Sequence, residues 1–251
     1  MPYPLLAHQA PVLPLKAWWP GYFNGTALVV GSLAPDLQNF WIRATGADEL
    51  GHTFVGQLTF CLPITLAVVL LVGNLDLGAV VAARFGKRFA WLAGAATAVA
   101  RPGGFERATI SALVGSFSHL AFDALTHEAI PAGRLRHFHH LAFTMHSVAQ
   151  AVASVLGALV TLAYLRKISV QNAREAPPRR PGAWLLVLGA LAGAALGAKR
   201  SMPAIHHPDW YFEAGRVYVW GYAAFLVVAA MSAGAACGAA VLAVLDRRRA
   251  A

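Results

Sequence analysis

Five long apolar segments constrain the possible fold of this chain more than any other feature of its sequence. They cover residues 57–74, 108–125, 141–165, 183–198 and 217–245. A transmembrane helix needs about 20 apolar residues to cross the hydrocarbon core of a bilayer, and each segment reaches or approaches that length. Only 12% of the residues are charged, which is about half the share of a typical soluble domain. The sequence therefore predicts an all-α fold, a polytopic transmembrane helical bundle with about five spans.

Two shorter apolar stretches lie outside the five segments. Residues 22–34 are too few to span a bilayer, and they predict a short N-terminal helix that is half-inserted or re-entrant. Residues 89–100 lie between basic residues and predict an interfacial helix. Because no internal repeat is visible, we expect a single membrane domain over residues 1–251, with an N-terminal half (1–165) and a second half that holds two further transmembrane helices (166–251).

Basic residues are unevenly distributed among the connections between the predicted spans. The connection after the first span, the connection after the third and the segment after the fifth are rich in Lys and Arg, whereas the other connections carry fewer. By the positive-inside rule the rich connections face the cytoplasm. We therefore expect a cytoplasmic C-terminus and, with five spans, an extracytoplasmic N-terminus. The residues behind this assignment are Arg84, Lys87, Arg88, Arg101, Arg107, Arg166, Lys167, Arg174, Arg179, Arg180, Arg247, Arg248 and Arg249.

The same distribution decides which partners a chain with a net charge of +9 is expected to have. Its basic residues gather in short loops, and no basic stripe interleaved with aromatic residues is present, so we expect no nucleic-acid partner. The expected partners are the lipid bilayer and a lipid or other hydrophobic small molecule. Cys61 and Cys237 lack a CxxC spacing and are predicted to be small buried or lipid-facing residues.

Histidine and aspartate residues gather at one predicted level of the bilayer, in its extracytoplasmic half. His119 and Asp123 are four residues apart on the second predicted span, so their side chains share a helix face about 5–6 Å apart. His127 follows about 6 Å further along the axis, and His146 repeats the same spacing with Gln150 on the next span. The segments before the first span bring His8, Asp36 and His52 to the same level.

A metal ion is the partner that best explains this gathering. An Asp inside a span costs about 2.5–3.5 kcal/mol on the insertion scale, and a divalent ion is best able to hold several imidazoles and carboxylates together. We therefore predict a site in the N-terminal half for one or two divalent ions, with zinc as the first choice and iron as the alternative. The candidate ligands are His8, Asp36, His52, His119, Asp123, His127 and His146.

Simpler interpretations stay open for individual residues. His119 and Asp123 suit an intramembrane hydrogen-bonded pair, and Asp36, which follows Pro35, suits a turn or the end of a helix. His52 taken alone suits a solvated loop histidine.

Several motifs resemble those of the DUF4184 family of bacterial integral membrane proteins. They are MPYPLLAHQAPVLPL, GSLAPD, GHTFVGQL, SHLAFDALTH and QAVASVLG, and they occur in matching order over residues 1–165. The family usually has Ser-His where this chain has Ala7-His8, so the histidine is kept. The resemblance implies a multi-pass protein of the bacterial inner (cell) membrane, in which the distribution of basic residues predicts the N-terminus and the site on the extracytoplasmic side.

The order of the ligand residues is also similar, more distantly, to zinc-dependent phospholipase C, to S1/P1 nucleases and to membrane-bound metal-dependent hydrolases. This likeness implies that five residues are metal ligands: His8, Asp36, His52, His119 and Asp123. The carboxylate of Asp123 would bridge two metal ions. His127 and His146 would serve a further ion. The chain departs from the pattern at Gln150, where a Glu is usual, and it lacks the N-terminal Trp whose amine binds zinc, so one or two ions are expected rather than three.

Three hypotheses for function follow. The first is a membrane-embedded metal-dependent hydrolase acting on a phosphoester or other bond of a lipid or lipid-linked substrate, with Asp36 and Asp123 as catalytic residues. Arg134 and Arg136, beside several histidines, suit an anionic headgroup. The second is an iron-dependent membrane oxidoreductase acting on a lipid or hydrophobic metabolite. The third is a non-enzymatic metal-binding membrane protein or transporter, against which the apolar inner halves of the spans argue.

Overall fold

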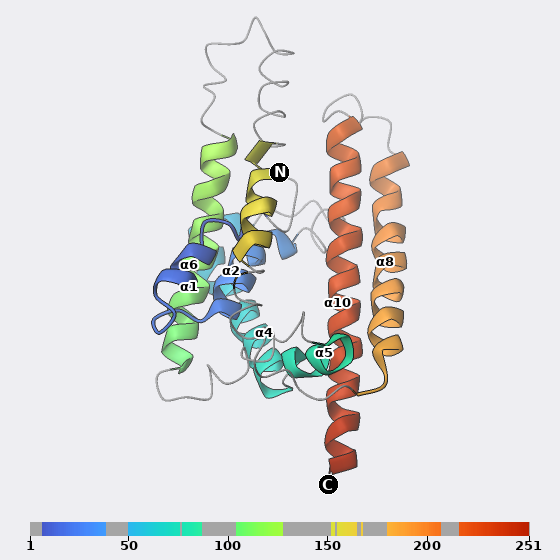
Figure 1. Cartoon of the computed structure of the whole chain (residues 1–251). Helices are drawn as coiled ribbons and strands as arrows, with labels where there is room; N and C mark the ends of the chain where they lie inside the picture. Colours follow the sequence, from blue (N-terminus) through green and yellow to red (C-terminus); the bar gives the residue numbers. More distant parts are fainter. Residues whose placement is uncertain are drawn as a thin grey trace, which may run out of the picture. The chain divides into compact units, whose positions relative to one another are not determined.

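The structure, a computed structural model, describes residues 7–38, 50–75, 77–86, 104–127, 152–153, 155–164, 167, 180–206 and 216–250. Regular secondary structure within these ranges is helical throughout and contains no strand, which confirms the prediction of an all-α fold (Figure 1). The predicted interfacial helix at 89–100 lies outside the described residues.

The chain divides into two compact units. The first contains residues 1–70 and 98–166, and the second contains residues 71–97 and 167–251. Residues 71–97, which fall within the N-terminal half of the predicted domain, thus belong to the second unit. The helices are α1 (Leu13–Trp18), α2 (Gly25–Leu37), η2 (Leu50–His52), α3 (Phe54–Gly56), the π-helical turn η3 (Gln57–Cys61), α4 (Leu62–Asn74), α5 (Leu77–Phe85), α6 (Gly104–His127), α8 (Ala183–His206) and α10 (Arg216–Ala250).

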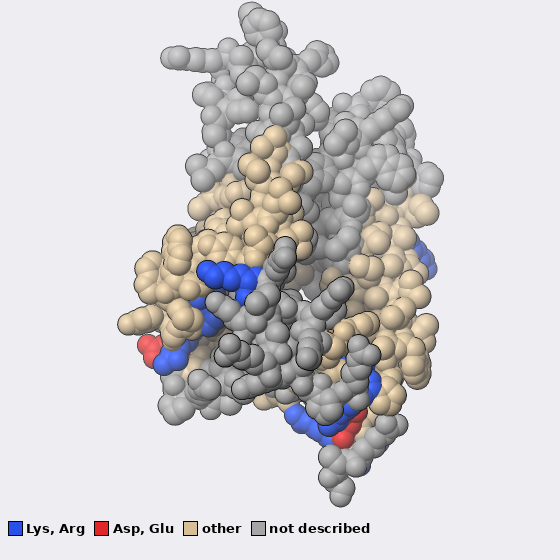
Figure 2. Space-filling model, in the orientation of Figure 1, with Lys and Arg blue, Asp and Glu red and all other residues tan. Residues whose placement is uncertain are grey.

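Three helical stretches in the described part of the chain are long and apolar enough to cross a membrane. They are Phe54–Val72, Ala183–Met202 and Ala230–Arg248, and they overlap the first, fourth and fifth predicted spans. Their apolar side chains remain exposed, as at Trp184 (61%) and Leu191 (60%). On the face shown in Figure 2, uncharged residues cover most of the described surface and the charged ones lie in a few clusters. These features indicate a membrane protein.

The other two predicted spans are not among these three stretches, so a bundle of five spans is not confirmed in the described part of the chain. The second, at 108–125, lies within α6, which has 24 residues. Of the third, at 141–165, the structure describes a shorter apolar helix, Val155–Tyr164.

The short N-terminal helix occupies a different range from the predicted 22–34. Helix α2 begins at Gly25, after Asn24, whose side chain accepts a hydrogen bond from the amide of Ala27 at 3.0 Å and caps the helix. It continues through Pro35 to Leu37. The predicted end at residue 34 is therefore wrong, since the helix continues to Leu37 and Asp36 lies in its last turn. Packing against α6 explains why the helix persists through a proline that usually ends one.

Helices α2 and α6 run parallel and approach closely through small residues. A Cβ on Gly115 would lie 2.4 Å from the Leu28 carbonyl oxygen. One step earlier the Asn24 amide donates to Ser111 Oγ at 2.8 Å, and one step later His119 contacts the Ser32 carbonyl oxygen. Each pair is separated by 87 residues in sequence, so a stripe of every fourth residue on α2 faces the equivalent stripe on α6.

The second unit is built on α8 and α10, which also pack through glycines. A Cβ on Gly189 would lie 2.2 Å from the Gly234 carbonyl oxygen, and one on Gly234 would lie 1.9 Å from the Gly189 carbonyl oxygen. Such backbone-to-backbone contact is typical of membrane helix pairs. Helix α5 adds Leu77 and Val80 to the core of this unit.

Candidate metal centre

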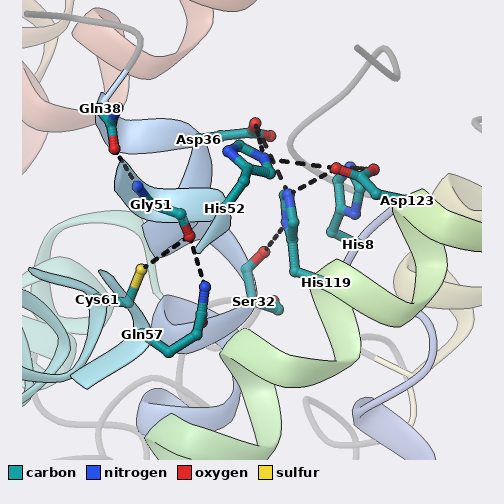
Figure 3. Close-up of polar contacts among 10 residues, drawn as sticks. All are labelled: His8, Ser32, Asp36, Gln38, Gly51, His52, Gln57, Cys61, His119 and Asp123. Carbon is teal, nitrogen blue, oxygen red and sulfur yellow. Dashed lines mark hydrogen bonds and ion pairs between the residues drawn. The ribbon is translucent and has the colours of Figure 1, made fainter. Parts of the chain in front are cut away.

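Five of the seven predicted ligands converge in the first unit (Figure 3). The segment before α1 supplies the first, α2 the second, the η2 turn the third and α6 the last two. These residues are His8, Asp36, His52, His119 and Asp123.

The α2–α6 register explains how two of these elements bring their polar groups together. The stripe that pairs Asn24 with Ser111 and Ser32 with His119 leads, one helical turn later, to Asp36 on α2 and Asp123 on α6. The two carboxylates therefore project from adjacent positions on facing helices. The interface that starts as small-residue packing ends as a cluster of ionisable groups.

The distances between the donor atoms are short throughout the cluster. Asp123 Oδ2 lies 3.2 Å from His119 Nε2 and 3.5 Å from His52 Nε2. Asp36 Oδ1 lies 3.8 Å from His119 Nε2 and 3.9 Å from His52 Nε2. The second carboxylate oxygen of Asp123, Oδ1, lies 3.9 Å from His8 Nε2.

These separations approach the spacing that a shared ion requires of its ligands. Zinc–nitrogen and zinc–oxygen bonds of about 2.0–2.1 Å at tetrahedral angles place neighbouring ligand atoms roughly 3.3–3.4 Å apart. Hydrogen bonds between the same groups are usually shorter, about 2.7–3.2 Å, and four of the five measured separations exceed that range. The donor chemistry and the spacing therefore fit a divalent cation.

The donor atoms form two overlapping groups. His8, His119 and Asp123 make one group, and Asp36, His52 and His119 make the other; within each, the ligand atoms lie within 4.8 Å of one another. His119 belongs to both groups, and Asp123 directs one oxygen toward His8 and the other toward His52 and His119. The arrangement offers ligands for one ion or for two neighbouring ions.

The tautomer of His119 is set by α2. Its Nδ1 lies 2.8 Å from the Ser32 carbonyl oxygen, and because a carbonyl only accepts, Nδ1 carries the proton and donates. In the neutral ring Nε2 then has a free lone pair, and this atom points toward both carboxylates. A backbone carbonyl that fixes the tautomer of a ligating histidine is a common support in metal sites.

His8 reaches the cluster because the segment before α1 packs tightly on the helix at Val155–Tyr164. A Cβ on Gly157 would lie 2.7 Å from the Ala7 Cα, which favours a small residue at position 7. His8 is fully buried, and its ring stacks on His119 with centroids 4.0 Å apart. The ring of Phe122 lies edge-on to His8, with centroids 5.3 Å apart. Packing thus holds His8 beside α6.

The cluster is buried on one side and accessible on the other. The side chains of His8 and His119 are fully buried, whereas those of His52 and Asp123 are 19% and 16% exposed. Burial raises the pKa of the Asp36 carboxyl above its ordinary value, an effect that Asp123 reinforces and that His119 and His52 oppose. Buried carboxylates need compensating charge, and solvent or a substrate can approach from the side of His52 and Asp123.

The remaining two predicted ligands are not placed in this cluster. His127 is the last residue of α6, and its side chain lies outside the described part of the chain, as does all of His146. Residues without a predicted role also support the site: Ser32, Gln38, Gly51 and Gln57. The motif GHTFVGQL contains two of them, but an amide and a glycine carry no sequence pattern specific to metal sites.

Comparison with known proteins identifies the family of the chain. The family described as "Domain of unknown function (DUF4184)" matches residues 1–244, so the chain belongs to this family. The match extends well past the motifs at 1–165 and includes all but the last seven residues of the second unit. No curated protein and no solved structure matches the chain, and the similarity in ligand order to phospholipase C and S1/P1 nucleases stays a prediction.

Proposed function

We propose that this DUF4184 protein is a membrane-embedded metal-dependent hydrolase that cleaves a phosphoester or other bond of a lipid or lipid-linked substrate, with water as the nucleophile. The observation that carries the proposal is the convergence of three imidazoles and two carboxylates, from four separate segments, within ligand distance of one another. A divalent ion bound there supplies Lewis acidity, which acidifies water and stabilises negative charge on the attacked group.

Each residue has a task that its geometry supports. His119, whose Nδ1 donates to the Ser32 carbonyl oxygen and whose Nε2 faces both carboxylates, would hold the ion together with His8 and His52. Asp123, with Oδ1 near His8 and Oδ2 near His52 and His119, would contribute a carboxylate to an ion bound beside any of these imidazoles. Asp36 Oδ1 lies 3.8 Å from His119 Nε2 and 3.9 Å from His52 Nε2, and we assign to it the acceptance of a proton from water.

The surroundings of the cluster favour an amphiphilic substrate. Directly after His52 the chain exposes Phe54 (69%), Val55 (61%) and Leu58 (44%) at the start of a candidate membrane span. Lipid chains contact such surfaces, so a lipid-linked substrate can keep its apolar part in the bilayer while its polar bond reaches His52 and Asp123. Further spans at 108–125 and 141–165, and an extracytoplasmic site, belong to the same proposal.

Metal analysis of the full-length protein, purified without a polyhistidine tag or chelators, tests the proposal. We expect one or two equivalents of zinc and cleavage of phospholipid esters in mixed micelles, lost on chelation and restored by Zn²⁺. Iron with no hydrolysis would favour the membrane oxidoreductase instead, since iron accepts the same ligands. Absence of any stoichiometric ion in the wild type would end the metal hypothesis.

Labelling of single cysteines in intact cells tests the topology. A cysteine at position 170, in the basic connection after the third predicted span, should be protected from an impermeant reagent added outside. Labelling from outside would reverse the assignment of the site to the extracytoplasmic side.

A further inference from the structure

The segment that carries His52 is held by a set of polar contacts outside the metal cluster (Figure 3). Gly51, directly before His52, donates its amide proton to Gln38 Oε1 beyond the end of α2. Its carbonyl oxygen accepts from Gln57 Nε2 at 2.5 Å and from Cys61 Sγ at 3.6 Å. Both backbone polar groups of Gly51 are therefore bound by side chains from the elements on either side.

Close packing leaves this turn little freedom. A Cβ on Gly51 would lie 2.6 Å from the Pro35 carbonyl oxygen, so the turn presses on the part of α2 that carries Asp36. Beyond His52, Thr53 Oγ1 accepts from the Gly56 amide at 3.0 Å and caps α3. The contacts of Gly51 therefore help to set the 3.9 Å separation between His52 Nε2 and Asp36 Oδ1.

Gln57 is an unusual residue for its position. It is fully buried near the start of the candidate span Phe54–Val72, where an unpaired amide is costly. Among the described residues its Oε1 has no hydrogen-bond partner, so the bond to Gly51 is the contact that accounts for its amide. Gln57 also opens the π-helical turn Gln57–Cys61, a distortion often found at functional sites.

We propose that Gln57 is a positioning residue for His52: it holds the Gly51 carbonyl so that the His52 imidazole faces Asp36 and Asp123. The proposal rests on the metal-binding function of the cluster. Gln57 touches neither carboxylate nor any imidazole in the contacts described, so its effect must pass through the Gly51–His52 backbone. Supports of this kind typically change metal affinity by about 10–100-fold when removed.

The experiment compares Gln57→Met, which keeps the length of the side chain but removes the donor, with Thr65→Val as a matched control. Thr65 is also fully buried on the same helical run and its Oγ1 has no hydrogen-bond partner among the described residues. Titration of the metal-free, full-length protein with Zn²⁺ should show affinity about 10–100-fold weaker for Gln57→Met and unchanged for Thr65→Val. In His52→Ala, adding Gln57→Met should cause no further loss, because the residue through which it acts is absent.

A second readout requires no metal. Diethylpyrocarbonate modifies accessible, neutral imidazoles, and mapping by mass spectrometry gives a rate for each histidine. In the metal-free protein Gln57→Met should raise the rate at His52 several-fold and leave His8 and His119 unchanged. Gln38→Met, which frees the amide of Gly51, should act in the same direction and serves if Gln57→Met does not fold.

The outcomes separate this proposal from the proposed function. Wild-type affinity and modification rates in both variants would overturn the positioning role, as would faster modification of all three histidines, which indicates general loosening. If the wild type binds no ion, the proposed function fails and the rate at His52 alone decides the positioning role. Additive losses in the double variant would show that Gln57 acts elsewhere than through His52.

Discussion

Two helix pairs in this protein pack through glycines, but they differ in the side chains that follow the glycine contacts along the interface. The α2–α6 pair and the α8–α10 pair both bring backbones together through glycines, at Gly115 in one and at Gly189 and Gly234 in the other. On α2 and α6 the stripe of contacts continues from Ser111 and Ser32 to Asp36 and Asp123. Both pairs therefore pack closely, and the α2–α6 pair is distinguished by the ionisable side chains at the end of its stripe of contacts.

In the second unit a carboxylate pairs with two guanidinium groups. Asp246 on α10 lies 2.8 Å from Arg84 Nη2 and 3.4 Å from Arg180 Nη1. A carboxylate matched by guanidinium groups forms a structural ion pair, whereas carboxylates matched by imidazoles form a set of metal ligands. The comparison indicates that the choice of cationic partner, more than burial, separates a scaffold from a candidate site.

The strongest test of this comparison overpacks each helix pair. Gly115→Leu forces α2 away from α6, because even a Cβ would lie 2.4 Å from the Leu28 carbonyl oxygen, and the cost should reach about 3 kcal/mol or more. Asp36 then moves away from Asp123, and bound metal should be lost. Gly234→Leu should cost at least as much stability yet leave the metal content of the folded fraction unchanged. Thermal unfolding and metal analysis of the soluble fraction measure both effects.

A smaller but sharper effect is expected from replacing one carboxylate in each unit. Asp123→Asn keeps the size and removes the charge, so Zn²⁺ affinity should fall by at least about 100-fold, beyond the loss typical of residues outside the ligand shell. The protein should still fold, because an amide is cheaper to bury than a carboxylate. Asp246→Asn should do the reverse, lowering stability by about 3–5 kcal/mol by leaving buried Arg84 unpaired while metal binding persists. Equal metal content in wild type and Asp123→Asn would favour a plain hydrogen-bonded pair with His119.

The histidines should rank by how many of the two ligand groups they serve. His119 belongs to both groups and His8 to one, so His119→Ala should lower Zn²⁺ affinity more than His8→Ala. His146→Ala should have the smallest effect, since His146 is predicted to serve only a further ion. Competition titrations with a chromogenic chelator give the order. A larger loss for His8→Ala than for His119→Ala would contradict the shared role of His119.

The features that could be predicted from the sequence are those that leave a local pattern of residue types or spacings. Apolar length indicated a membrane protein, and the four-residue spacing of His119 and Asp123 indicated that they share a face. His8, Asp36 and His52 could be singled out because ionisable residues are rare in so apolar a chain. The structure brings these five side chains together.

Other features depend on tertiary contacts that leave no local pattern. Helix α2 runs through Pro35 because α6 supports it along its length, although Pro-Asp alone signals a turn. Helix α5 joins the second unit through Leu77 and Val80, which are ordinary apolar residues. Gln57 acts on a backbone carbonyl six residues away, and such a contact becomes visible only when the turn itself is placed.

The smallest effect concerns the start of the α2–α6 stripe. Ser111→Ala removes the acceptor of the Asn24 amide, a buried bond of 2.8 Å, and should lower stability by about 1–3 kcal/mol. Asn24 lies twelve residues before Asp36, about 18 Å along α2 at 1.5 Å per residue, and Gly115 and the Ser32–His119 bond hold the register in between. Zn²⁺ affinity should therefore change less than about threefold, which is under 1 kcal/mol. A much larger loss of Zn²⁺ affinity would mean that the register of α2 against α6 is set at Asn24 and transmitted along the whole helix. The close contact at Gly115 would then not by itself align the two carboxylates.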